Sequence, residues 1–124
     1  MLEGVACNLY TGLRAFGENG TAIGSIDAIG GAANSGLLLD IFADVWGVPV
    51  SARDLVDEAN AIGAAVVGGV GVGIFSDFDV ALSFSRRTER REPDPGRHRR
   101  YGAEYETFLD AYRRLEPWFD GLAR

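Results

Sequence analysis

The sequence contains no lysine and has one cysteine, one histidine and one methionine among its 124 residues. All 12 basic residues are therefore arginine, and with 18 acidic residues the net charge is -6. That charge argues against general binding to nucleic acid. A single cysteine excludes an internal disulfide, and one cysteine with one distant histidine cannot build a metal-ligand cluster. We predict no metal site and no nucleic-acid partner.

Long apolar runs are also missing. The longest stretch of low polarity, from Ala61 to Phe75, has about 15 residues, whereas a bilayer-spanning helix needs about 20. No basic region precedes an apolar segment near Met1, which argues against a signal peptide. The hydrophobic fraction of 47% is enough for the core of one domain. We therefore expect a cytoplasmic protein without a membrane partner.

Apolar residues recurring at steps of three and four predict a first helix, which ends at the "GENG" of residues 17–20. Its expected apolar stripe is Leu2, Val5, Leu9, Leu13 and Phe16. Cys7 lies among apolar neighbours, so we expect a buried thiol there. The helix begins almost at the first residue without an N-cap, as in a chain that is entered in mid-structure.

A short strand is expected over residues 25–29, followed by a second helix. Asn34 or Ser35 is a suitable N-cap for that helix, and Gly47 suits its C-terminus. Its expected apolar face is Leu37, Leu38, Ile41, Phe42 and Val45. Residues 48–51 form a second extended segment.

Acidic residues at positions 54, 57 and 58 mark the start of a third helix, where they would meet the positive end of its dipole. This helix is rich in glycine, and each glycine in a helix interior costs about 1 kcal/mol relative to alanine. A sequence tolerates that cost where another segment of backbone packs closely against the helix. We therefore expect the helix to be buried on most sides, against elements that these residues do not fully supply.

Arginines are concentrated between Arg86 and Arg100, among acidic residues, prolines and His98, a composition that predicts a solvated loop. A last helix is expected from Tyr101 to Leu115, with an aromatic stripe that serves packing rather than a cofactor. Trp118 and Phe119 would extend that contact.

The segment "GGAANS" (residues 30–35) lies between the first strand and the second helix. One interpretation is a structural turn, because glycine adopts positive φ and lets a strand and a helix meet closely. The other is an anion or nucleotide site, because small residues let a phosphate approach free N–H groups at the helix N-terminus. The segment matches neither G-x-G-x-x-G nor the P-loop pattern, so these six residues alone leave both interpretations open.

Four motifs follow one another along the chain. They are Glu3-Gly4-Val5-Ala6, Gly30-Gly31-Ala32-Ala33-x-Ser35, Ala43-Asp44-Val45-x-Gly47, and Glu58-Ala59 followed by Gly63-Ala64-Ala65. In this order and spacing they closely resemble the C-terminal end of the FGGY family of carbohydrate kinases, most of all its xylulokinase-like members. The tail from residue 92 to residue 112 also looks like the family's final helix. Leu38 and Asp40 depart from the family, whose members often carry Trp and Gln there.

The resemblance implies an α/β fold, namely part of the C-terminal domain of an actin-like, ribonuclease-H-like ATPase, helix-rich with short strands. Residues 1–85 would form the ATP-side portion of that domain, residues 86–100 an arginine-rich loop, and residues 101–124 its C-terminal helix and tail. The implied cofactors are ATP and Mg²⁺, with the Mg²⁺ ligands mainly outside this chain. The implied nucleotide-binding residues are Gly30, Gly31 and Ala32, through the backbone, with Asn34 and Ser35 near the adenine and ribose. The same resemblance favours Glu58 as a helix cap.

The upstream motifs of the family are absent, including its Asp-x-Gly-Thr phosphate loop and the Gly-x-Gly-Asp segment that holds the catalytic base. We therefore assign no catalytic residue. The predicted function is an ATP-dependent sugar kinase acting on a pentulose such as xylulose or a similar polyol. This chain would be its nucleotide-binding part and inactive alone. The alternative is a free-standing, non-catalytic interaction domain that retains a remnant of the kinase fold. Both are compatible with a homo-oligomer.

Overall fold

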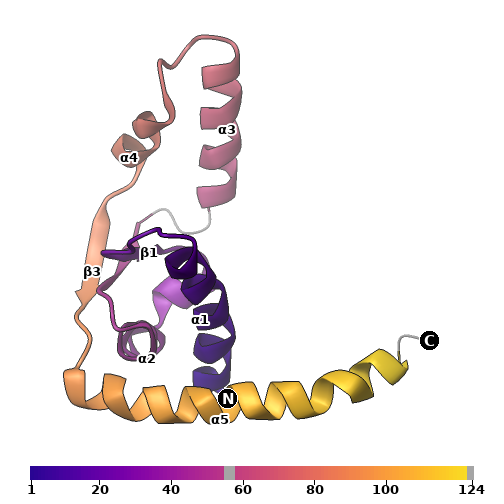
Figure 1. Cartoon of the computed structure of the whole chain (residues 1–124). Coiled ribbons are helices and arrows are strands. Elements are labelled where there is room, and N and C mark those ends of the chain that lie inside the picture. The colour runs from indigo at the N-terminus through magenta and orange to yellow at the C-terminus, as the bar shows by residue number, and fades with distance from the viewer. Residues whose placement is uncertain (55–57, 123–124) are drawn as a thin grey trace.

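The computed structural model describes residues 1–54 and 58–122. The elements are α1 (Leu2–Glu18), β1 (Ile26–Ala28), η1 (Gly31–Asn34), α2 (Gly36–Trp46), β2 (Val50–Arg53), α3 (Ala59–Gly71), η2 (Phe78–Val80), α4 (Ala81–Phe84), β3 (Arg87–Arg91) and α5 (Pro95–Leu122). Figure 1 shows a body formed by the sheet with α1, α2 and α5, and an arm of α3, η2 and α4 that projects from it. The helix-rich α/β class with short strands agrees with the prediction.

The sheet has the strand order β1-β2-β3. β1 and β2 are parallel, with Ile26 opposite Val50 and Ala28 opposite Ala52. Parallel neighbours need a crossover connection, and α2 provides it. β3 runs antiparallel to β2, and its register shifts between Ser51 and Arg53. The carboxyl ends of β1 and β2 therefore lie together at the edge where the "GGAANS" segment begins.

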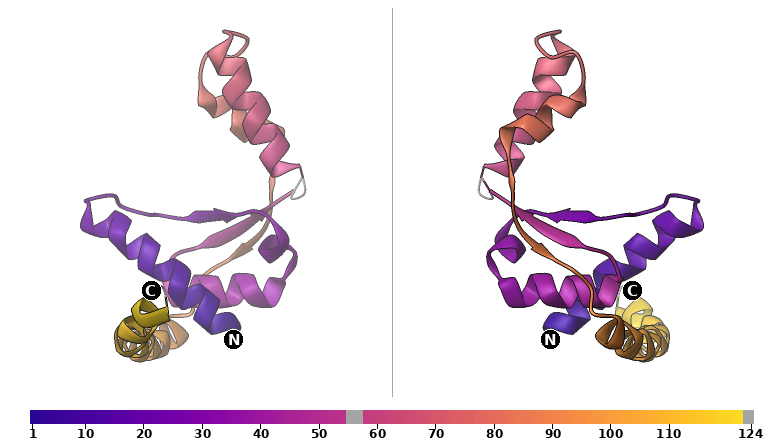
Figure 2. Two further views of the ribbon diagram at one scale, coloured as in Figure 1. Left: turned by 90° about the vertical axis from the view of Figure 1, so that its right-hand side faces the viewer. Right: turned by 90° about the vertical axis from the view of Figure 1, so that its left-hand side faces the viewer.

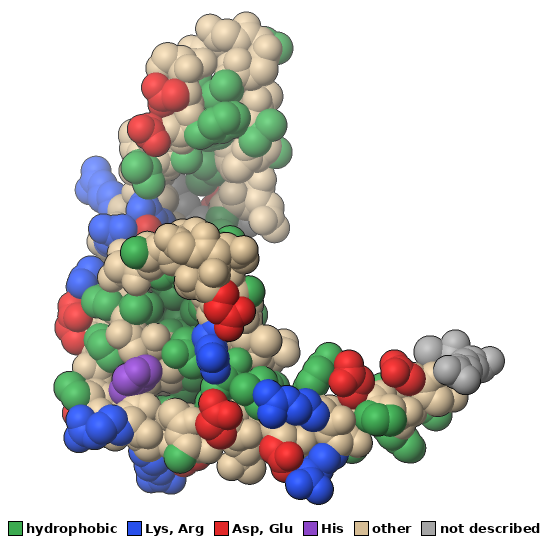
Figure 3. All heavy atoms as spheres, in the orientation of Figure 1, with side chains coloured by type: hydrophobic (Ala, Val, Ile, Leu, Met, Phe, Trp, Pro, Cys, Tyr) green, Lys and Arg blue, Asp and Glu red, His purple; other side chains and the backbone are tan. Residues whose placement is uncertain are grey.

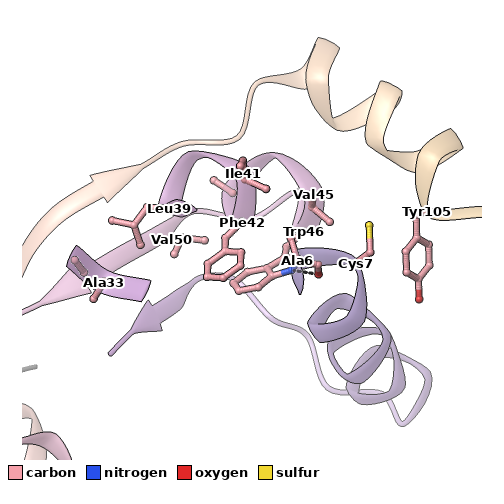
Figure 4. Packing of buried hydrophobic residues seen from close by; sticks show 12 residues of the cluster. Ala6, Cys7, Ala33, Leu39, Ile41, Phe42, Val45, Trp46, Val50 and Tyr105 are labelled. Carbon is pink, nitrogen blue, oxygen red and sulfur yellow. Dashed lines mark hydrogen bonds between the residues drawn. The ribbon is translucent and has the colours of Figure 1, made fainter. Parts of the chain in front are cut away.

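α2 forms the centre of the core. Most of its side chains are buried, as expected for a helix that is hydrophobic on nearly all sides. Phe42 and Trp46 stack with ring centroids 4.3 Å apart. The Trp46 indole N–H donates to the Ala6 carbonyl of α1 at 3.0 Å, as Figure 4 shows. Ser35 and Gly47 cap the two ends of α2 as predicted, and Gly47 adopts the left-handed conformation.

The predicted apolar stripe of α1 is mostly wrong. The helix packs on α2 through Ala6 and Cys7, both buried, while four members of the stripe face outward. Those exposed residues are Leu2, Val5, Leu9 and Phe16. Small residues make this contact because they let the two helices approach closely. The buried Cys7 thiol is confirmed, and burial raises its pKa.

The arginine-rich segment is not a loop. Residues 87–91 form β3, paired with β2, and α5 begins at Pro95. Asp94 caps that helix, because its side chain accepts the Arg97 backbone N–H at 2.7 Å. This hydrogen bond lowers the pKa of Asp94. Proline is favourable at the first position of a helix. Asp94 followed by Pro95 therefore indicates the start of α5, and our interpretation of this segment as a loop was wrong.

α5 is longer than predicted and continues through Pro117 to Leu122. Its first half packs on the body through Tyr101, Tyr105, Phe108 and Leu109. The Tyr105 hydroxyl lies 3.1 Å from that of Thr11 on α1. The expected contact of the later aromatics is wrong, because the side chains at the distal end are exposed. These side chains are Tyr112, Leu115, Trp118, Phe119 and Leu122.

α3 is not enclosed by the described residues. Only Val66 and Gly69 of this helix are buried, and in both views of Figure 2 it projects beyond the sheet. Glu58 stands at its N-cap position but forms no capping hydrogen bond through its side chain, so the expected cap is wrong. Residue 57, also expected near this start, lies outside the described residues. Across residues 1–54 and 58–122, no helix combines the length and apolar character needed to span a bilayer.

Candidate functional site

The "GGAANS" segment leaves β1 at its carboxyl end and enters α2. Gly30 has φ 77°, a conformation that favours glycine, and precedes the 3-10 turn η1. A Cβ added to Gly30 or Gly31 would meet no atom within 4 Å. The structural-turn interpretation therefore accounts for Gly30, whereas nothing in the described part of the chain fills the space beside Gly31. A ligand can approach the backbone there.

Unpaired N–H groups gather at the same segment. Among the described residues, the amides of Gly30, Gly31 and Ala32 have no hydrogen-bond partner. The first two amides of α2, those of Gly36 and Leu37, also find no partner in the part of the chain that the structure describes. Free N–H groups at a helix start attract anions, reinforced by the helix dipole. The segment thus combines open space with a set of donors.

The five nucleotide-binding residues proposed from the sequence differ in what they can offer a ligand. Gly30, Gly31 and Ala32 form one continuous stretch that can offer its backbone to a ligand. Asn34 lies exposed at the end of η1. The Ser35 hydroxyl instead accepts the Leu38 backbone N–H at 3.3 Å, so its side chain serves as a helix cap.

A hollow of about 220 Å³ lies beside this segment, between the carboxyl ends of β1 and β2 and the root of the arm. Apolar atoms dominate its lining. Its walls are Asp27, Ile29, Arg53, Asp54, Ala59, Ile62, Gly63, Ala81, Leu82 and Ser85. Ligands of open α/β sheets bind outside the carboxyl ends of parallel strands, which is where this hollow lies.

An ion-pair cluster closes one side of the hollow. Arg53 donates to Asp27 through Nε at 2.9 Å and Nη2 at 2.7 Å, and to the Ser85 carbonyl at 2.9 Å. Arg87 on β3 donates to the same carboxylate at 2.8 Å. Burial raises the pKa of Asp27, but the hydrogen bonds and positive charge of the two arginines outweigh it and hold that pKa below its usual value. The sequence-based predictions did not include this cluster, because its members lie on three strands that are distant along the chain.

The two positions that depart from the family now have a structural account. Asp40 pairs with Arg91 of β3, with Oδ1 and Nε 3.5 Å apart. Arg91 also binds Glu89 and lies against Gly36, where a Cβ would be 2.9 Å from its Nη2. Leu38 is half-buried against the core. Among the described residues, no three His, Cys, Asp or Glu side chains are grouped so that they could hold a metal ion.

Comparisons with solved structures define the fold. Xylulose kinase from Rhodospirillum rubrum superimposes with a TM-score of 0.77 at 30% identity, covering 96% of this chain and 24% of that one. The chain therefore has the fold of part of the C-terminal domain of an actin-like ATPase. Within the described residues, β1 and β2 are the parallel pair of the sheet, and α2 joins them.

Sequence comparison identifies the family. The profile of the FGGY family of carbohydrate kinases, C-terminal domain, matches residues 1–72. A glycerol kinase from Citrifermentans bemidjiense is 36% identical over 100 residues, which are 80% of this chain and 20% of that protein. A xylulose kinase from Staphylococcus epidermidis is 28% identical over 117 residues, 94% of this chain and 23% of that protein. The chain belongs to the FGGY family and spans about a fifth of the length of these relatives.

Proposed function

We propose that this chain is the nucleotide-binding part of an ATP-dependent sugar kinase. The whole enzyme would transfer the γ-phosphoryl group of ATP to a hydroxyl of a pentulose such as xylulose, or of a similar polyol. The observation that carries the proposal is the "GGAANS" segment, where open space and unpaired amides meet at the carboxyl end of β1. Membership of a carbohydrate kinase family supports the reaction class.

The proposed contacts follow from the geometry of the segment. The amides of Gly30, Gly31 and Ala32 would donate to phosphate oxygens, since they have no partner among the described residues. The adenosine would extend toward the apolar hollow beside Ile29 and Ile62. Asn34 would contact the base or ribose with its amide. The Ser35 hydroxyl stays on Leu38, so Ser35 would act by fixing the start of α2.

Mg²⁺ would neutralise charge on the phosphates during transfer, and we propose that its ligands lie mainly outside this chain. Two acids belong to the described lining of the hollow: Asp27 is bound by two arginines, and Asp54 accepts the Arg86 backbone N–H at 2.6 Å. Outside the hollow, Asp40 pairs with Arg91 and Asp44 pairs with Arg97. A carboxylate held in such pairs is a weak base toward a sugar hydroxyl. We therefore propose that the isolated chain binds ATP without transferring phosphate.

Gly31→Val tests the contact surface. The new side chain meets no protein atom within 4 Å and needs no positive φ, so the fold should persist while the ligand space is filled. Gly24→Val is the matched control, because Gly24 is equally open but precedes β1 at its opposite end. Calorimetric titration with Mg·ATP should show at least tenfold weaker binding for Gly31→Val and unchanged binding for Gly24→Val. Equal affinity of both variants and the wild type would refute the proposed contact.

A separate assay tests the proposal that the isolated chain does not transfer phosphate. Purified chain is incubated with radiolabelled ATP, Mg²⁺ and either xylulose or glycerol, and phosphorylated sugar is separated and counted. The expected result is no product above the protein-free blank. Sugar phosphate formed in proportion to the chain concentration, and absent from a mock purification, would show that these residues contain a complete catalytic site.

A further inference from the structure

A cluster of three charged side chains joins the three strands at one end of the sheet. Asp27 of β1 accepts hydrogen bonds from Arg53 at the end of β2 and from Arg87 at the start of β3. Arg53 and Arg87 stand directly opposite each other in the register of β2 and β3. Like charges in such opposed positions destabilise a sheet, so this pairing depends on the carboxylate that the two arginines share. Figure 3 shows basic side chains together where the arm meets the body.

The cluster also connects the arm to the strand that leads into the "GGAANS" segment. Through Nη1, Arg53 donates to the Ser85 carbonyl at 2.9 Å and to the Ser85 hydroxyl at 3.2 Å. Ser85 lies between α4 and β3, and Asp27 stands three residues before Gly30. One guanidinium group therefore binds both β1 and the base of the arm. Its planar fork suits this double contact, whereas the compact ammonium group of a lysine cannot reproduce it.

The residues that Arg53 joins are walls of the hollow beside the segment. Asp27 lines the hollow on the sheet side, and Ser85 lines it at the base of the arm. The Arg53 side chain is 12% exposed and that of Asp27 is 25% exposed. Removing either partner would leave the other charge partly buried and uncompensated. The placement of the two walls relative to each other therefore depends on this ion pair.

We propose that Asp27 is a positioning residue of the nucleotide site, which acts through Arg53 and Arg87 to hold the walls of the hollow in the arrangement that accepts ATP. The Asp27 oxygens accept four hydrogen bonds from the two arginines, so the carboxylate acts through them and not on the nucleotide. The inference rests on the proposed nucleotide site and names the residue that fixes its shape.

Asp27→Asn distinguishes this role from two simpler ones. If Asp27 acted only through its charge, removing a negative charge beside a phosphate ligand would strengthen binding, because like charges repel. If the cluster only stabilised the sheet, the variant would unfold more easily, while the folded protein would bind ATP as before. The positioning role predicts weaker binding by the folded protein, which neither simpler role produces.

The measurement is calorimetric titration of the 124-residue chain with Mg·ATP at constant ionic strength, at a temperature where circular dichroism shows each variant fully folded. Asp27→Asn and Arg53→Lys should bind at least fivefold more weakly than the wild type. Asp27→Glu keeps the charge and should regain most of the lost affinity. Asp44→Asn is the matched control, because it removes the charge from another buried carboxylate, which pairs with Arg97 outside the hollow. Its affinity should be unchanged.

Binding by Asp27→Asn that equals or exceeds that of the wild type would overturn the inference. An equal loss in Asp44→Asn would also overturn it, because the loss would then follow from breaking any buried ion pair. Should Asp27→Asn not fold, Arg53→Lys decides by the same criterion. A wild-type chain that does not bind Mg·ATP would refute the proposed function and the inference with it, so the wild-type titration tells the two failures apart.

Discussion

Asp44 offers a quantitative test of how α5 is held on the body. The side chain is 3% exposed and lies on α2. Its carboxylate accepts the Asp94 backbone N–H at 2.8 Å and Arg97 Nε at 2.5 Å. The Asp44 carbonyl lies 2.8 Å from His98 Nδ1. One acid thus ties the capping turn and first turn of α5 to the centre of the core.

The magnitude for Asp44→Ala follows from these contacts. A hydrogen bond to a charged group contributes about 1.5–3 kcal/mol, and leaving a buried donor unpaired costs about 1–3 kcal/mol. The Arg97 side chain is 60% exposed and regains water, so its share is reduced. We expect the free energy of unfolding to fall by about 2–3 kcal/mol for Asp44→Ala, mainly through the Asp94 amide.

Urea titration followed by circular dichroism at 222 nm measures this loss. Asp44→Asn is the graded control, because an amide oxygen still accepts the Asp94 N–H but carries no charge for Arg97. Its loss should be smaller than that of Asp44→Ala. A change within about 0.5 kcal/mol for Asp44→Ala, the range of ordinary surface substitutions, would show that the anchor does not hold α5.

Three further outcomes are expected. Gly47→Ala should cost about 1–3 kcal/mol in urea titration, because Gly47 is left-handed and a Cβ would lie 2.5 Å from the His98 ring; an unchanged midpoint would contradict this. Ser35→Ala should cost about 1 kcal/mol through loss of the α2 cap, with Ser35→Thr retaining most of it. Asp27 has a lowered pKa, so its stabilising contribution is present above its unfolded pKa near 4 and is lost as pH falls through its folded pKa. Stability of Asp27→Asn should therefore decline less between about pH 5 and pH 2 than that of the wild type, and equal declines would exclude this role.

The parts of the fold that the sequence predicted were those with local signals. Ser35 and Gly47 bounded α2 because capping depends on a few neighbouring residues. The sequence-based predictions were wrong for features that depend on residues far away along the chain. β3 has no apolar alternation and is a strand because β2 supplies its hydrogen bonds. The packed face of α1 follows from how closely α2 approaches, which favours small Ala6 over large Leu9.

The candidate site shows the same contrast between features with local signals and features that need distant residues. The open backbone at Gly30 and Gly31 could be predicted locally, since it needs only small residues before a helix, whereas their contact with a nucleotide stays a prediction. The cluster of Asp27 with Arg53 could not be, because it joins residues from different strands and requires the parallel register. The cap expected at Glu58 did not form, because charge alone does not place a carboxylate against a helix end.

We propose that the segment after β1 contacts ATP. Its most direct test is amide chemical-shift mapping of the ¹⁵N-labelled chain titrated with Mg·ATP. We expect the largest shifts to fall on Gly30, Gly31 and Ala32, and Gly31→Val to abolish them. Saturable shifts confined to other parts of the chain, with these three amides unmoved, would contradict it.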